Sequence, residues 1–243
     1  MKTFTLAVRN AKEIVRDPLN LCFGLGFPII LLLLMTAIQS SIPVALFELE
    51  TLTPAITVFG LSFTTLFSAT LISKDRRSAL LQRLYTTPLT PLNFILGYAL
   101  PILPIAVAQC TICYGVALIL GLKITINVLF AILFIIPTSI FFVALGLLFG
   151  SVLNDKQVGG ICGALLTNLT AWLSGAWFDL ELVGGVFKQI AELLPFVHAV
   201  ELERAVLSGN FVYVMPHLLW VLGYALITVI IAVLLFLRQM KKQ

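Results

Sequence analysis

The stretch that decides the fold class is Asn127–Leu153, which reads NVLFAILFIIPTSIFFVALGLLFGSVL and contains no Asp, Glu, Lys or Arg. A helix needs about 20 apolar residues to cross the hydrocarbon core of a bilayer, so this run is long enough for one membrane span. Five more uncharged apolar runs flank it: Leu19–Ser41, Pro54–Ser73, Asn93–Leu120, Val158–Phe178 and Val214–Leu237. The sequence therefore predicts an all-α integral membrane protein, a single transmembrane domain with six transmembrane helices.

The composition of the whole chain agrees with a membrane protein. Of its 243 residues, 60% are hydrophobic and 11% are charged, and the mean hydropathy is +1.09. Soluble domains carry about 25% charged residues. A soluble protein with so little charge would lack the polar exterior that keeps it dispersed. Soluble enzymes and nucleic-acid-binding domains are therefore excluded.

The charged residues lie between the apolar runs, and their signs distinguish two sides. One side holds 12 of the 15 basic residues: Lys2, Arg9, Lys12, Arg16, Lys74, Arg76, Arg77, Arg83, Lys156, Arg238, Lys241 and Lys242. The other side holds three basic residues and seven of the 11 carboxylates. By the positive-inside rule we expect both termini in the cytoplasm. Six spans return the chain to the side on which it starts, which agrees with this orientation.

Residues 1–18 form a basic amphipathic segment before the first run. Six apolar residues share one face of the expected helix: Phe4, Ala7, Val8, Ala11, Ile14 and Val15. We expect this helix to lie along the inner membrane surface and to be separated from the first span by Pro18. It would serve either as a platform for a cytoplasmic partner or as a simple interfacial anchor.

Residues 74–92 lie between the second and third runs. Four apolar residues share one face of a short predicted helix: Leu80, Leu81, Leu84 and Tyr85. Three basic residues project elsewhere: Arg76, Arg77 and Arg83. A solvated loop needs no apolar stripe, so a cytoplasmic helix that docks on a partner is favoured over an ordinary basic loop.

Residues 179–213 form a long outer segment between the fifth and sixth runs. Apolar residues follow helical spacing from Leu182 to Leu194, Pro195 interrupts the pattern, and a second short helix is expected through residues 200–206. Neither helix is long enough to span a bilayer. We expect both to dip into the outer leaflet while packed on protein, which is the condition for irregular structure at membrane depth.

The chain offers no catalytic or metal-binding constellation. His198 and His217 lie on or near the outer side, and the four cysteines lie inside apolar runs without a neighbouring His or carboxylate. We therefore expect no enzymatic activity, no metal and no cofactor in this chain.

The composition of the apolar runs also indicates where the energy for any uphill transport would come from. Ion-driven carriers usually need ionisable groups at membrane depth, and the six runs contain no Asp, Glu, Lys or Arg. The chain also lacks a Gly-x-x-x-x-Gly-Lys-Ser/Thr phosphate loop. If the protein moves a substrate uphill, we expect the energy to come from a separate polypeptide.

Neutral polar side chains inside the runs could either line a route or join helices. Ser and Thr more often serve in helix packing, whereas Gln and Asn are costlier to bury. Gly146-x-x-x-Gly150 and Gly159-x-x-x-Gly163 would let helices approach closely. The candidate pathway residues are Thr65, Ser68, Gln109, Thr167 and Asn168.

Three stretches resemble the permease subunit of type-2 ABC exporters, a prokaryotic family that includes drug- and antibiotic-resistance exporters. The first is Ser73–Pro91, SKDRRSALLQRLYTTPLTP, followed by FILG at residues 94–97. The second is LSGAWF at Leu173–Phe178, similar to the end of the family's fifth span. The third is LPFVHAVELER at Leu194–Arg204, similar to the family's Pro-containing outer segment with a downstream Arg.

This resemblance implies a half-transporter in a bacterial plasma membrane. Two six-span subunits, two copies or a copy and a paralogue, would enclose the route, and two cytoplasmic ATPase subunits would bind ATP and Mg²⁺ beneath them. The segment of residues 74–92 would be the coupling helix, and residues 1–18 the connecting helix beside it. A channel or membrane scaffold without an ATPase is the alternative from another class.

Overall fold

The computed structural model describes residues 2–42, 47–78 and 90–240, and within these ranges it is all-helical with no strand. Five helices are long and apolar enough to cross a membrane and are candidate spans. They are α2 (Pro18–Gln39), α3 (Leu49–Arg77), α5 (Pro91–Ile119), α6 (Ile126–Val152) and α12 (Phe211–Met240). The predicted all-helical class is confirmed, and five of the six predicted runs correspond to these long helices.

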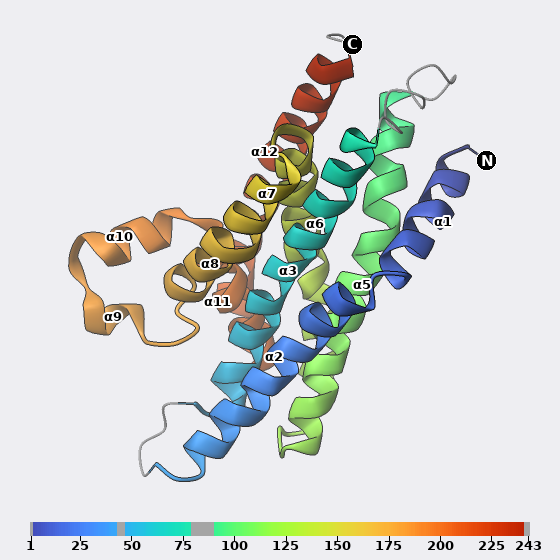
Figure 1. Cartoon of the computed structure of the whole chain (residues 1–243). Coiled ribbons are helices and arrows are strands. Elements are labelled where there is room, and N and C mark those ends of the chain that lie inside the picture. The colour runs from blue at the N-terminus through green and yellow to red at the C-terminus, as the bar shows by residue number, and fades with distance from the viewer. Residues whose placement is uncertain (1, 43–46, 79–89, 241–243) are drawn as a thin grey trace.

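Helix α3 is the central element of the bundle. It packs against α2, α5 and α6 (Figure 1), and 78% of its most apolar window is buried, compared with 17% for α2 and 22% for α12. The uncharged part of α3, residues 51–73, suits this position, because small and hydroxyl side chains allow helix backbones to approach closely. The outer helices α2 and α12 keep large apolar surfaces exposed, which suits contact with lipid or with another membrane chain.

The predicted run Val158–Phe178 corresponds to three short helical pieces that follow one another directly. These are α7 (Asp155–Val158), the π-helical η1 (Gly159–Leu166) and α8 (Thr167–Leu173). The helical run ends at Leu173, earlier than the predicted boundary. Gly175 has φ +70°, a left-handed conformation that commonly terminates a helix and that glycine adopts without strain.

The N-terminal helix α1 (Lys2–Val15) ends shortly before Pro18, the residue predicted to separate it from the first span. The Asp17 side chain caps α2 by accepting a hydrogen bond of 3.3 Å from the backbone N–H of Asn20. Pro18 occupies the first turn, where its missing N–H costs nothing. The predicted apolar face is divided, because Ala7 and Ile14 are buried against the bundle. Phe4 and Val15 are about 70% exposed.

The buried face of α1 packs against the first half of α5. Leu6 lies over Gly97, where an added Cβ would come within 2.6 Å of a Leu6 methyl carbon. The Asn10 amide donates a hydrogen bond of 3.0 Å to the Gly97 carbonyl. Helix α1 therefore has two apolar surfaces, one that packs on α5 and one that is exposed.

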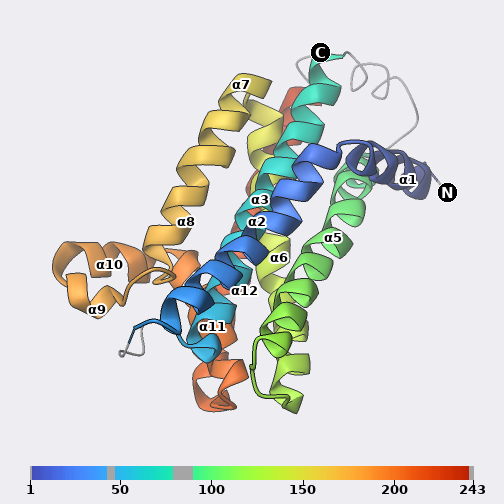
Figure 2. The ribbon, with the colours of Figure 1, turned by 60° about the horizontal axis from the view of Figure 1, so that its bottom comes forward.

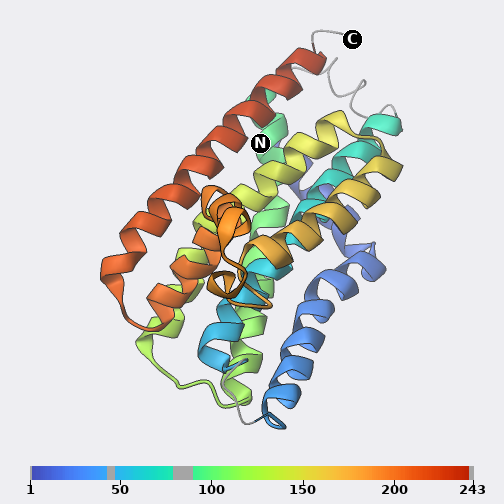
Figure 3. The same ribbon diagram turned by 90° about the vertical axis from the view of Figure 1, so that its left-hand side faces the viewer.

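Three short helices form the segment before α12: α9 (Leu180–Val183), α10 (Gly185–Leu193) and α11 (Pro195–Leu207). The predicted break at Pro195 is present, since Pro195 begins α11, but the first predicted helix is divided into α9 and α10 at Gly184, which has φ +60°. Helices α9 and α10 project from the bundle (Figure 1). Helix α11 lies beside the first turns of α12, which runs along one edge of the bundle (Figure 3), and most of α11 is buried.

The two termini lie at the same end of the bundle as the end of α3 and the start of α5, whereas the α2–α3 and α5–α6 connections lie at the opposite end (Figures 1 and 2). We call the first the basic end, because most of the Lys and Arg residues of the chain occur there. The sequence grouped the charges into the same two sides.

Candidate functional site

A buried ion pair joins α1 to α3 at the basic end. The Arg9 guanidinium donates to both oxygens of Asp75, with Nη2 at 2.7 Å from Oδ1 and Nη1 bonded to Oδ2. The Tyr98 hydroxyl of α5 donates to the same Asp75 Oδ2 at 2.8 Å. Asp75 is only 4% exposed, so these donors replace the water that its carboxylate would otherwise bind. One carboxylate thus holds three helices together.

Arg76 joins α3 to the end of α6. Its two terminal nitrogens donate to the carbonyls of Ser151 and Leu153. The last carbonyls of a helix have no partner within the helix, so a guanidinium fork satisfies them and also complements the negative end of the helix dipole. Arg76 therefore fixes the end of α6 to the end of α3.

Two further ion pairs at this end are more exposed. Arg77 Nη1 lies 2.9 Å from Asp155 Oδ2 at the start of α7, and the Arg77 side chain is 79% exposed. Lys74 Nζ lies 3.3 Å from Asp17 Oδ2 at the start of α2. Exposed pairs add little stability. They nevertheless connect α3 to the starts of α2 and α7.

The predicted coupling residues divide between described and undescribed parts of the chain. Arg76 and Arg77 form the last turn of α3, which continues beyond the predicted boundary at Ser73 because Arg9, Ser151 and their neighbours bind its charged turn. The other coupling residues fall in residues 79–89, outside the described ranges: Leu80, Leu81, Arg83, Leu84 and Tyr85. Their role stays a prediction.

Two candidate pathway residues join α3 to α6. The Thr65 hydroxyl donates to the Phe142 carbonyl at 2.7 Å, and Ser68 to the Val143 carbonyl at 3.4 Å. The approach of these helices is close, because an added Cβ at Gly146 or Gly150 would lie within 3 Å of α3 backbone atoms. In the single chain Thr65 and Ser68 therefore face α6, and the first glycine pair serves helix packing.

The other three candidates are distributed over two elements. Gln109 is buried between α5 and α3, with its amide against Gly60. Thr167 is half-buried and lies 3.4 Å from the Ser62 hydroxyl. Asn168 is exposed, and its amide donates to the Ala164 carbonyl one turn earlier. The structure brings Thr167 and Asn168 together on α8 but does not gather all five candidates.

A buried acid at the other end of the bundle was missed by the sequence reasoning. Glu203 of α11 is 0% exposed, and its Oε2 accepts a hydrogen bond of 2.9 Å from the Tyr114 hydroxyl of α5. Burial raises the pKa of Glu203 to about 8, against the opposing effect of this bond. The sequence contains a pattern that indicates this burial, because Val200, Glu203 and Leu207 follow the spacing of one helical face.

Polar contacts also position α11 against its other neighbours. Arg204 donates to the carbonyls of Thr51 and Gly175, at 3.2 and 3.1 Å. His198 and His217 approach with their Nδ1 atoms 3.0 Å apart, and His198 stacks on Trp220. Both histidines thus act in the packing of α11 on α12. In the described part of the chain, no group of three His, Cys, Asp or Glu residues could hold a metal ion.

Long apolar helices with charged ends define a multi-pass membrane protein. The chain belongs to the ABC-2 type transporter family, whose model matches residues 1–208. It is therefore the membrane component of an ABC transporter. Permeases of this family pair with ABC ATPase subunits and normally lack catalysis of their own. A comparison with curated proteins found no match.

Proposed function

We propose that the chain is the permease subunit of an ATP-driven exporter in a bacterial plasma membrane, powered by two separate cytoplasmic ATPase subunits that bind ATP and Mg²⁺. In this proposal α7, η1 and α8 together form the fifth of six spans. The basic end, with both termini, faces the cytoplasm by the positive-inside rule, and α9–α11 lie in the outer leaflet.

The observation that carries this proposal is the way in which the end of α3 is bound. Its last turn contacts α1 through Asp75, α6 through Arg76 and α7 through Arg77. Residues 79–89 continue directly from that turn. A force applied there by an ATPase would reach several helices at once through short, charge-assisted contacts. A coupling element requires such a connection, whereas a simple loop does not.

The transport route would lie between this chain and a second copy or a paralogue. Helices α2 and α8 both pack on α3, and each has an exposed face. We propose that Asn168 and Thr167 lie on this route, because Asn168 is exposed there. Thr65 and Ser68, which bond to α6, act in helix packing, and Gln109 would reach the route only if α3 and α5 separated. ATP-driven alternation between inward- and outward-facing states would then move the substrate.

Reconstitution with and without the ATPase tests this function. The permease is co-expressed with the ATPase encoded beside it, purified, and incorporated into proteoliposomes. We expect the ATPase to co-purify, and its ATP hydrolysis to increase when the permease is present. A permease that purifies alone and conducts K⁺ across vesicles without an ATPase would instead be a channel.

A further inference from the structure

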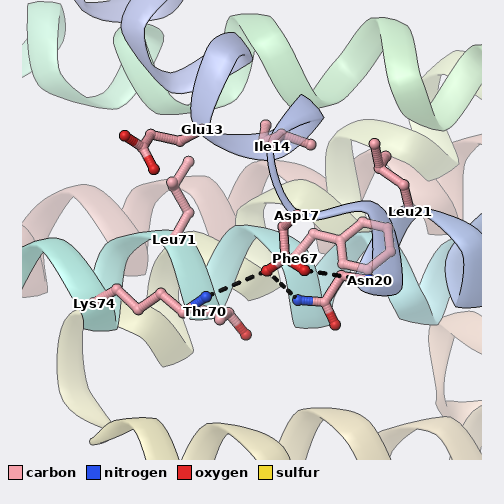
Figure 4. A pocket seen from close by; sticks show the side chains of 9 residues that line it. All are labelled: Glu13, Ile14, Asp17, Asn20, Leu21, Phe67, Thr70, Leu71 and Lys74. Atoms are coloured by element: carbon pink, nitrogen blue, oxygen red, sulfur yellow. Dashed lines mark hydrogen bonds and ion pairs between the residues drawn. The ribbon is translucent and has the colours of Figure 1, made fainter.

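The bend between α1 and α2 encloses a small cavity against the basic-end half of α3 (Figure 4). Its volume is about 50 Å³. Five polar residues line it: Glu13, Asp17, Asn20, Thr70 and Lys74. Four apolar residues complete it: Ile14, Leu21, Phe67 and Leu71. We call this the elbow cavity.

The charges of the elbow cavity favour a cationic group. Two carboxylates, Glu13 and Asp17, and one amine, Lys74, line the cavity, and Lys74 pairs with Asp17 (Figure 4). Burial raises the pKa of Asp17, but the hydrogen bonds from Asn20 and Lys74 outweigh it, so the pKa lies below its ordinary value and Asp17 is ionised. Glu13 Oε1 lies 3.9 Å from Arg9 Nη2, and that guanidinium is already engaged by Asp75. The Glu13 carboxylate can therefore accept a further donor.

Lys74 offers a place for an anion at the edge of the same cavity. Its Nζ lies 3.3 Å from Asp17 Oδ2, and more than half of the side chain is exposed. An ammonium carries three donors, so this contact leaves donors available. A ligand with a cationic group and an adjacent anionic group would satisfy both parts of the site.

The size of the elbow cavity limits the cationic group. One water needs roughly 10–15 Å³ of such volume, so about 50 Å³ holds about three to five waters. A primary ammonium on an ethylene stem has three non-hydrogen atoms and fits this space. A trimethylammonium on the same stem has six and also lacks N–H donors.

An apolar path leads away from the elbow cavity along α2. Asn20, Phe23 and Phe27 follow helical spacing and share one face, and both phenylalanines are exposed. An acyl chain whose headgroup occupied the cavity would lie against this face. The exposed Phe4 and Val15 of α1 indicate that the same region meets the bilayer surface.

We propose that the elbow cavity binds a phospholipid with a primary-amine headgroup, of the phosphatidylethanolamine class. Its ammonium donates to Glu13, its phosphate lies beside Lys74, and one acyl chain follows α2. This inference goes beyond the proposed transport function, since it depends only on the basic end lying at a membrane surface. A lipid bound there would hold the angle between α1 and α2.

Binding of defined lipids to the purified full-length chain tests this site. Phosphatidylethanolamine, phosphatidylcholine and phosphatidylglycerol with identical acyl chains are compared by native mass spectrometry and by the thermal unfolding midpoint. We expect phosphatidylethanolamine to bind about tenfold more tightly than phosphatidylcholine, the equivalent of one charge-assisted hydrogen bond. A preference for phosphatidylglycerol, or no preference, would overturn the proposal. So would stabilisation by soluble ethanolamine equal to that by the lipid.

Variants separate the two halves of the site. Glu13→Gln should remove the preference for ethanolamine over choline, whereas Lys74→Gln should weaken both lipids equally, since both carry the phosphate. Glu50→Gln is the matched control, because Glu50 pairs with Lys123 at the opposite end of the bundle. Retention of the full preference in Glu13→Gln would also overturn the proposal.

Discussion

Arg9 of α1 and Asp75 of α3, 66 positions apart, form a two-pronged ion pair at the basic end, and Tyr98 of α5 donates to the same carboxylate. Salt-bridged carboxylates on a protein surface contribute little, but Asp75 is buried. The pair therefore determines how α1 sits on α3 and α5. In the proposed mechanism, α1 moves together with the end of α3.

A double-mutant cycle measures the contribution of this pair. Arg9→Ala, Asp75→Ala and the double variant are compared through the free energy of unfolding in bicelles. We expect a coupling energy of about 1–3 kcal/mol, the range for directly bonded groups. The same cycle on the exposed pair Lys123–Glu50 is the control, with an expected coupling of about 0–1 kcal/mol. Equal coupling in the two cycles would refute the structural role of Arg9.

Adjacent arginines at the end of α3 should respond differently to substitution. Arg76→Ala leaves the carbonyls of Ser151 and Leu153 without their donor, so we expect a loss of about 1–3 kcal/mol in the free energy of unfolding. Arg77→Ala breaks an exposed pair and should cost no more than about 1 kcal/mol. If Arg77 docks on the ATPase, its variant will weaken ATPase binding while folding normally. The opposite ranking in stability would contradict the geometry.

Glu203 makes the stability of the protein depend on pH. Its pKa is raised to about 8 by burial, above the ordinary value of 4.5, so the folded state binds a proton that the unfolded state has released between these values. The stability that this proton contributes is present below about pH 4.5 and is lost as pH rises towards 8. We expect the unfolding midpoint of the wild type to fall over this range.

Glu203→Gln provides the test, because glutamine can accept the Tyr114 hydrogen bond and does not ionise. The difference in unfolding midpoint between this variant and the wild type should grow from pH 5 to pH 8. Histidines that titrate in the same range affect both proteins alike. A difference that stays constant with pH would show that Glu203 is ionised in the folded state.

The close contact of α3 and α6 predicts opposite effects for two glycine substitutions. An added Cβ at Gly150 would lie 2.8 Å from the Ala69 Cα and carbonyl oxygen, so Gly150→Ala must separate the helices, at a cost of about 1–3 kcal/mol. Gly115→Ala in α5 meets nothing within 4 Å and should be neutral or slightly stabilising, because alanine favours the helix. Unfolding of both variants in the same detergent makes the comparison.

Most of the fold could be predicted from the apolar runs and the prolines. Uncharged runs of membrane-spanning length predicted the long helices, because backbone groups in a bilayer must be satisfied within a helix. Pro18 and Pro195 marked the breaks that the structure shows, because each begins a helix. The predicted apolar face of α1 is divided, because Ala7 and Ile14 are buried against the bundle whereas Phe4 and Val15 are exposed.

Contacts between residues far apart in the sequence could not be predicted from local patterns. Asn10 is a polar residue, yet it is buried. Its side-chain amide donates a hydrogen bond to the carbonyl of Gly97, 87 positions away. Arg76 resembled a partner-facing residue, whereas its nearest acceptors are carbonyls of α6, which no local pattern indicates. Glu203 was counted only as one of the seven carboxylates of the outer side, although its spacing placed it on an apolar face.

In the proposed mechanism, an ATPase docks on the segment that follows α3 in the sequence. Binding of the co-expressed ATPase to the purified permease in nanodiscs, measured by surface plasmon resonance, tests it most directly. The variant Leu81→Asp/Leu84→Asp places two charges on the predicted docking stripe, and Leu182→Asp is the control, because Leu182 is exposed on α9. We predict that the double variant loses at least about tenfold in affinity, about 1.4 kcal/mol, while the control binds as the wild type does. Unchanged ATPase binding by a folded double variant would show that the ATPase does not dock on this segment.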